Sequence, residues 1–124
     1  MKTNSRSYIT LSGILSPGGL LTLLLVSGGA SAVSAGTEAG QRVAADRKLG
    51  NCYSCHMVVG AELTGNAGPP LVQMKSRFPD RAALRAQIAD PRASNPNTIM
   101  PPYGAHNILT ERQLDDLVDY VLSL

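Results

Sequence analysis

Aromatic side chains are scarce in this chain of 124 residues. It contains no Trp, one Phe and four Tyr, so only 4% of its residues are aromatic. A domain of this size buries only about 60–65% of the surface of its extended chain and is marginally stable by itself. The composition therefore predicts one small domain that needs a further apolar group to complete its core.

Cysteine is scarce as well: the chain contains two, Cys52 and Cys55. A closed zinc site needs about four nitrogen or sulfur ligands, and these two cysteines with His56 and the distant His106 make a poor set. A dithiol oxidoreductase motif would lie in an alternating α/β pattern, which is absent. A disulfide between the two cysteines is possible but leaves His56 unexplained.

Both cysteines fall in Cys52-Tyr53-Ser54-Cys55-His56, which has the spacing of the C-x-x-C-H haem-attachment motif. The two thiols can add to the vinyl groups of a haem, and the histidine then reaches the iron from the same side. The motif predicts one covalent haem c, held by Cys52 and Cys55 and ligated by His56. A covalently held, largely apolar macrocycle would also supply the missing core.

The start of the chain has the pattern of a secretory signal. Lys2 and Arg6 precede an apolar stretch at residues 20–26 and then a run of small residues. We expect residues 1–35 to be a signal peptide, cleaved after Ala32 or Ala35, and residues 36–124 to form one domain in the periplasm. The apolar stretch is shorter than the roughly 20 residues of a spanning helix, so we expect no membrane span after processing.

Positive charge is lacking in the part that remains after cleavage. Removing residues 1–35 takes away Lys2 and Arg6 and leaves nine basic and nine acidic side chains. A neutral balance gives no indication of a nucleic-acid partner or of an anionic membrane surface.

Three segments of the remaining chain are predicted to be helices, so the fold class is all-α. The first spans about residues 37–49, where Gly40 permits close approach of another helix. The second spans about residues 80–89, with Asp80 as N-cap and Asp90-Pro91 as its end.

The third helix begins at Thr110, which forms a capping box with Gln113. Its apolar side chains recur with helical spacing and predict a buried face; they are Leu114, Leu117, Val118, Val121 and Leu122. Asp115, Asp116 and Asp119 lie on the other side, which favours a solvated face over a metal site. The long loop from Pro91 to Leu109 is expected to be functional.

The ring of His56 needs a partner for its second nitrogen, usually a backbone carbonyl. The rigid turn Gly68-Pro69-Pro70-Leu71 can supply one, and Pro69 is our choice. Alternatively, these prolines only end a loop.

A methionine sulfur opposite the histidine would fill the iron's coordination shell and raise the reduction potential. Met100 is favoured because Pro101 and Pro102 stiffen the loop that carries it. His106 in the same loop is the rival ligand. Met57 adjoins His56 and cannot easily reach the opposite face, and Met74 is expected to fill the core.

The order of helix, C-x-x-C-H, G-P-x-L, M-P and C-terminal helix is similar to that of class I c-type cytochromes. Within this class, the Gly68–Leu71 turn, Asp90-Pro91 and the loop Asn95-Pro96-Asn97-Thr98-Ile99-Met100-Pro101-Pro102-Tyr103-Gly104 resemble the SoxX family. The resemblance implies a class I cytochrome c fold, with three main helices around one covalent haem. It implies that Cys52 and Cys55 bind the haem, that His56 and Met100 ligate the iron, and that Pro69 and Leu71 belong to the cofactor site.

SoxX is the monohaem subunit of the SoxAX complex of sulfur-oxidising bacteria. The resemblance therefore implies a SoxA-like partner, the carrier protein SoxYZ as substrate of the complex, and a downstream cytochrome as electron acceptor. The complex is an L-cysteine S-thiosulfotransferase that couples thiosulfate oxidatively to a carrier cysteine, and this chain would accept the electrons without catalysing the bond formation.

Two alternatives remain open at this point. A freestanding, diffusible cytochrome c would commonly carry a ring of lysines, whereas Lys48 and Lys75 are the lysines left after cleavage. A haem enzyme or gas sensor would require that Met100 does not bind the iron.

Overall fold

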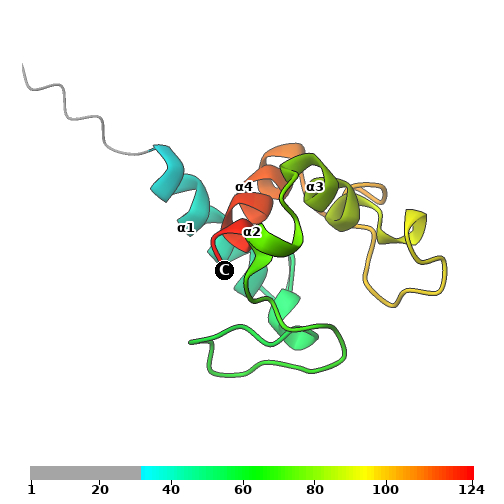
Figure 1. Cartoon of the computed structure of the whole chain (residues 1–124), viewed down its shortest axis with the longest axis horizontal. Helices are drawn as coiled ribbons and strands as arrows, with labels where there is room; N and C mark the ends of the chain where they lie inside the picture. The colour runs from blue at the N-terminus through cyan, green and yellow to red at the C-terminus, as the bar shows by residue number, and fades with distance from the viewer. Residues whose placement is uncertain (1–31) are drawn as a thin grey trace, which may run out of the picture.

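The computed structural model describes residues 32–124, and this part of the chain is helical without strands. Three longer helices form the body, namely α1 (Ala32–Ala45), α3 (Arg81–Ala89) and α4 (Glu111–Leu122) (Figure 1). The shorter elements are α2 (Met74–Arg77) and the 3₁₀ turns η1 (Cys52–Ser54) and η2 (Pro91–Ala93). Within residues 32–124 no helix has the length and apolar character needed to cross a membrane. The predicted signal peptide lies largely in residues 1–31, outside the described residues, and stays a prediction.

The first predicted helix is present, but its bounds were wrong. α1 begins at Ala32 and ends at Ala45, whereas the sequence indicated residues 37–49. The chain turns back after α1 because the N–H of Gly50 bonds to the carbonyl of Val43, and the N–H of Asn51 bonds to that of Asp46. These bonds within the turn replace the next helical bonds and bring the haem-attachment segment against the end of α1.

The two later helices begin where the sequence predicted. The Asp80 side chain accepts a hydrogen bond from the N–H of Ala82 at 2.8 Å and caps α3. Thr110 and Gln113 form the complete capping box of α4. These caps satisfy N–H groups that have no partner inside a helix, so each start is determined locally.

α1 and α4 cross at Gly40, which is buried. A Cβ atom at this position would lie 1.9 Å from the carbonyl oxygen of Asp116 and 2.7 Å from Cβ of Tyr120. No residue larger than glycine fits without moving one helix. The close approach expected at Gly40 is therefore present, and α4 is the helix that makes it.

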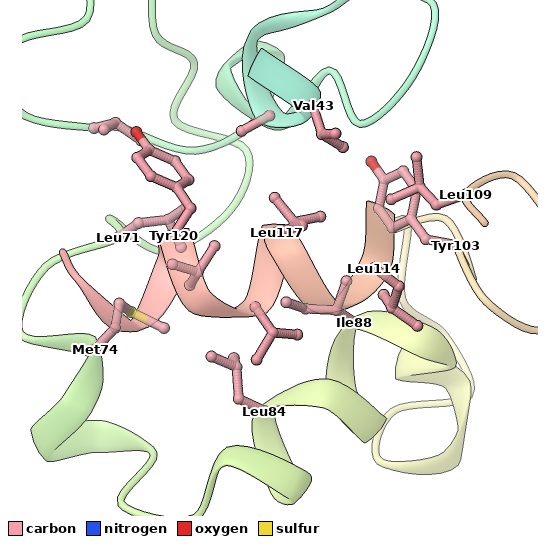
Figure 2. Close-up of a cluster of buried hydrophobic side chains, with 14 residues drawn as sticks. Val43, Leu71, Met74, Leu84, Ile88, Tyr103, Leu109, Leu114, Leu117 and Tyr120 are labelled. Atoms are coloured by element: carbon pink, nitrogen blue, oxygen red, sulfur yellow. The ribbon is translucent and has the colours of Figure 1, made fainter. Parts of the chain in front are cut away.

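The hydrophobic core surrounds α4. Figure 2 shows Val43 on one side of this helix and Leu84 and Ile88 of α3 on the other. Leu114, Leu117 and Val118 are 0–1% exposed, as the helical spacing predicted.

The acidic side chains Asp115, Asp116 and Asp119 of α4 are half-buried and are not simply solvated. Asp115 pairs with Arg81 and Arg85, and Asp119 pairs with Arg81 at 2.7 Å. Arg85 also bonds to Glu111. These ion pairs join α3 to α4, so the acidic cluster has a structural role that the pattern of a single helix did not indicate.

Candidate haem site

A cavity of about 450 Å³ lies between the helices and the two long loops of the chain. Its size falls in the range of roughly 300–1,000 Å³ that is usual for cofactor sites. All six predicted cofactor residues line this cavity: Cys52, Cys55, His56, Pro69, Leu71 and Met100. Residues separated by up to 48 positions in sequence therefore meet at one site.

The His56 ring is oriented by the turn that follows it. Its Nδ1 atom lies 2.7 Å from the carbonyl oxygen of Pro69, so the hydrogen bond expected from the sequence is present. A ring that donates from Nδ1 leaves Nε2 free to bind a metal. The assignment of His56 as iron ligand stays a prediction, and this geometry supports it.

Gly68 makes the contact between His56 and the Pro69 carbonyl possible. A Cβ atom on Gly68 would lie 2.4 Å from Cε1 of His56 and 2.7 Å from Nδ1. The N–H of Gly68 bonds to the carbonyl of Cys55 at 2.8 Å, and the N–H of Leu71 bonds to that of Met57 at 2.9 Å. The turn thus folds back along the haem-attachment segment, and the imidazole packs against bare backbone.

Cys52 and Cys55 form no disulfide. Burial raises the pKa of the Cys52 thiol to about 12, against a smaller opposing effect of a backbone hydrogen bond. Redox-active cysteines have a lowered pKa because the thiolate is the reactive form. The Cys52 thiol does not have this lowered pKa. In the part of the chain that is described, no group of three or more His, Cys, Asp or Glu side chains is placed to hold a metal ion.

Met100 is half-buried and packs against the core. Its N–H donates to Oγ1 of Thr98 at 3.1 Å, and the N–H of Thr98 donates to the carbonyl of Asn95 at 3.0 Å. Successive turns therefore hold the methionine loop at the cavity. Met57 is 44% exposed and does not line the cavity.

His106, the rival ligand, is exposed and does not line the cavity. Its Nε2 atom lies 3.1 Å from Nη1 of Arg92, which also pairs with Asp90 at 2.8 Å. This side chain contacts charged surface groups, so the geometry favours Met100 over His106.

The sequence did not indicate several residues of the cavity wall. Met74 is 3% exposed, as expected of a core residue, but it also lines the cavity from α2. Arg77 of the same helix donates to the carbonyl of Pro70 at 2.7 Å and so holds the turn that orients His56. Tyr103 lines the cavity from the methionine loop. The four residues of α2 are too few to leave a periodic signal.

The chain is similar to known proteins in sequence and in structure. The family model for cytochrome c matches residues 37–124. An uncharacterized lipoprotein of Aquifex aeolicus (strain VF5) is 32% identical to this chain over 75 residues. The match covers 60% of this chain but only 36% of the length of that protein. A chain in the crystal structure of SoxXA from P. pantotrophus matches with a TM-score of 0.63 and 25% identity, over 70% of this chain and 80% of that one.

The residues of the cavity fit a covalent haem. Two cysteines with the attachment spacing, a histidine oriented through Nδ1 and a methionine share a wall that is otherwise largely apolar. Thioether formation would use the Cys52 and Cys55 sulfurs, and His56 and Met100 are the residues that would hold the iron.

Proposed function

This chain belongs to the cytochrome c family, and we propose that it is the electron-transfer subunit of a periplasmic complex of the SoxAX type. It is all-α with the class I cytochrome c fold, and it carries covalent haem c. The family, fold and cofactor predicted from the sequence are thus confirmed. When bound, the haem iron takes up and releases an electron, so electron transfer is the role of the chain.

The proposed reaction of the complex joins thiosulfate to a carrier cysteine. A sulfur–sulfur bond forms between the thiosulfate sulfur and the cysteine thiol of a SoxYZ carrier, the thiol proton leaves, and two electrons are released. A SoxA-like partner subunit would catalyse this bond formation, as in an L-cysteine S-thiosulfotransferase. This chain would accept the electrons singly and pass them to a downstream cytochrome.

The observation that carries this proposal is the structural similarity to a chain of SoxXA, which covers 70% of this chain with a TM-score of 0.63. The two cysteines lie in the cavity, so neither is available as a separate catalytic sulfur. We therefore assign electron transfer to the cavity of this chain and formation of the sulfur–sulfur bond to the partner subunit.

The surface of the loops supports a subunit rather than a freestanding shuttle. Val59 and Leu63 are 80% and 77% exposed on the loop after His56, and Ile99 beside Met100 is 77% exposed. Large exposed aliphatic side chains on loops that also carry the proposed haem ligands are candidates for contact with a partner subunit. Residues 32–124 contain two lysines, Lys48 and Lys75. These are too few for the ring of lysines that a diffusible cytochrome commonly carries.

Co-expression tests the proposal. The chain is produced with haem attachment, together with a tagged SoxA-like subunit encoded in the same genome. We expect a stable one-to-one complex whose haem is reduced when thiosulfate and the reduced SoxYZ carrier are added. A chain that stays monomeric and is reduced equally well without the partner would instead be the freestanding cytochrome.

Leu63→Asp sharpens this test, with Ala82→Asp as matched control on the exposed face of α3. If the exposed aliphatic groups contact the partner, Leu63→Asp weakens the complex at least tenfold, whereas the control leaves it intact. Both variants should keep the parent's absorption spectrum. Equal affinity of the two variants would contradict the use of this loop as interface.

A further inference from the structure

A hydrogen bond joins the two segments that carry the proposed iron ligands. The hydroxyl of Tyr103 donates to the carbonyl oxygen of Gly50 at 2.5 Å. Tyr103 is 7% exposed, so this bond is shielded from water. Gly50 lies two residues before Cys52, and Tyr103 lies three residues after Met100. The bond thus spans 53 positions in sequence and ties the methionine loop to the haem-attachment segment.

Both ends of this bond are anchored. The N–H of Gly50 donates to the carbonyl of Val43 in α1 at 3.0 Å, and a Cβ atom on Gly50 would lie 2.7 Å from that oxygen. The carbonyl of Tyr103 accepts from the N–H groups of Ile108 and Leu109, each at 3.0 Å. The hydroxyl therefore joins two backbone positions that are already held.

The link between Tyr103 and Met100 is stiff. It consists of Pro101 and Pro102, whose rings restrict φ to about −65° and leave the backbone few soft torsions. A shift of Tyr103 is therefore passed on to Met100. Both side chains line the same cavity.

We propose that Tyr103 is a positioning residue for Met100: its hydroxyl holds the methionine loop against the haem-attachment segment and so keeps the thioether in place as iron ligand. This inference rests on the proposed ligation by Met100. Burial raises the pKa of Tyr103 above its usual range. The hydroxyl consequently stays protonated and keeps its ability to donate.

Ligand exchange in the ferric holoprotein tests this role. Imidazole is added as a competitor of the methionine, and loss of the weak red sulfur-to-iron charge-transfer band is followed. Tyr103→Phe keeps the ring and removes the hydroxyl, which leaves the Gly50 carbonyl buried without this partner. We expect the apparent dissociation constant of imidazole to fall about tenfold.

Tyr120→Phe is the matched control. Its hydroxyl is also engaged with a distant residue, because it lies 2.6 Å from the hydroxyl of Tyr53. Tyr120 is 5% exposed, so the same chemical change is made in a similarly buried place. The control touches the attachment segment but not the methionine loop, and we expect it to bind imidazole as the parent does.

The outcomes separate the two proposals. A parent protein without the charge-transfer band overturns both the ligation by Met100 and the role of Tyr103. A parent with the band, and a Tyr103→Phe variant with unchanged imidazole affinity, overturns the role of Tyr103 alone. Equal shifts in Tyr103→Phe and Tyr120→Phe would also overturn it, since they would reflect general loosening.

Pro102→Ala provides a second route if Tyr103→Phe does not accumulate as holoprotein. It keeps the Tyr103 hydroxyl and the carbonyl of residue 102, which accepts from the N–H of His106 at 3.0 Å, but it frees the link to Met100. We expect tighter imidazole binding in this variant as well. Unchanged binding would overturn the positioning role.

Discussion

At the scale of single residues, the geometry around His56 depends on the absence of a methyl group at Gly68. The imidazole occupies the space that any Cβ at this position would need. That packing brings Nδ1 to the Pro69 carbonyl and leaves Nε2 free for the iron that His56 is proposed to bind. A glycine before two prolines is therefore a requirement of the site and not only of the turn.

Gly68→Ala is expected to displace the His56 ring, because the new Cβ would lie 2.4 Å from Cε1. The holoprotein should form in low yield or show an altered axial-ligand spectrum. Absorption and magnetic circular dichroism of the ferric form measure the change. Gly60→Ala is the control: its φ of 85° makes the substitution strained, by about 1 kcal/mol, but no atom lies within 4 Å. A normal histidine signal in Gly68→Ala would contradict the prediction.

At the scale of elements, the contact between α1 and α4 organises the body of the molecule. The two helices approach so closely at Gly40 that the backbone of α4 contacts the glycine directly. The same crossing places α1, and the turn after it, beside the start of the haem-attachment segment.

Gly40→Ala should lower the free energy of unfolding by about 3 kcal/mol, because a Cβ 1.9 Å from the Asp116 carbonyl forces the helices apart. Chemical denaturation of the holoprotein measures this value. Gln41→Ala, at the exposed neighbouring position, should change it by no more than about 0.5 kcal/mol. Similar stabilities of the two variants would show that the crossing can adjust.

The ion pairs between α3 and α4 give a pH dependence. The hydrogen bond from Arg85 lowers the pKa of Asp115 below its usual range. A group with a lowered pKa in the folded state stabilises the fold above its unfolded pKa of about 4, and this contribution is lost as the pH falls through the folded pKa.

Asp115→Asn should therefore cost about 0.5–1 kcal/mol at pH 7, as is usual for exposed pairs, and almost nothing at pH 2. Urea denaturation at the two pH values measures the difference. Glu62→Gln makes the same charge change in an exposed loop and should have little effect at either pH. A cost of Asp115→Asn that does not depend on pH would rule out this explanation.

At the scale of the whole molecule, the cavity of about 450 Å³ and the hydrophobic core share residues. Leu71, Leu84 and Leu117 contribute to both the core and the cavity wall, so the haem completes their packing. The few aromatic residues and the small chain length already indicated this dependence.

The protein without its haem should not fold cooperatively. Cys52→Ala combined with Cys55→Ala removes both attachment sites, and we expect little helical circular dichroism and no sharp thermal transition. Met100→Ala is the control, since it removes one proposed ligand but keeps both thioether positions; it should stay folded. A sharp transition in the double variant would show that the polypeptide core suffices.

Sequence alone was sufficient for the features that depend on neighbouring residues. The attachment motif Cys52–His56, the caps at Asp80 and Thr110 and the buried face of α4 are each set by residues within a few positions of one another. Hydrogen bonding at a helix start and helical periodicity act locally, so the pattern in the chain carries them.

Tertiary structure alone decided the features that join distant segments. The ion pairs of Asp115 with α3 and the bond from Tyr103 to Gly50 both depend on partners that folding brings together. No periodicity or motif in the sequence predicts such a partner, because the interacting residues are far apart in the chain and meet only in the folded structure. The sequence determined the chemistry of the haem site, and the packing of its loops decided how the protein holds that chemistry in place.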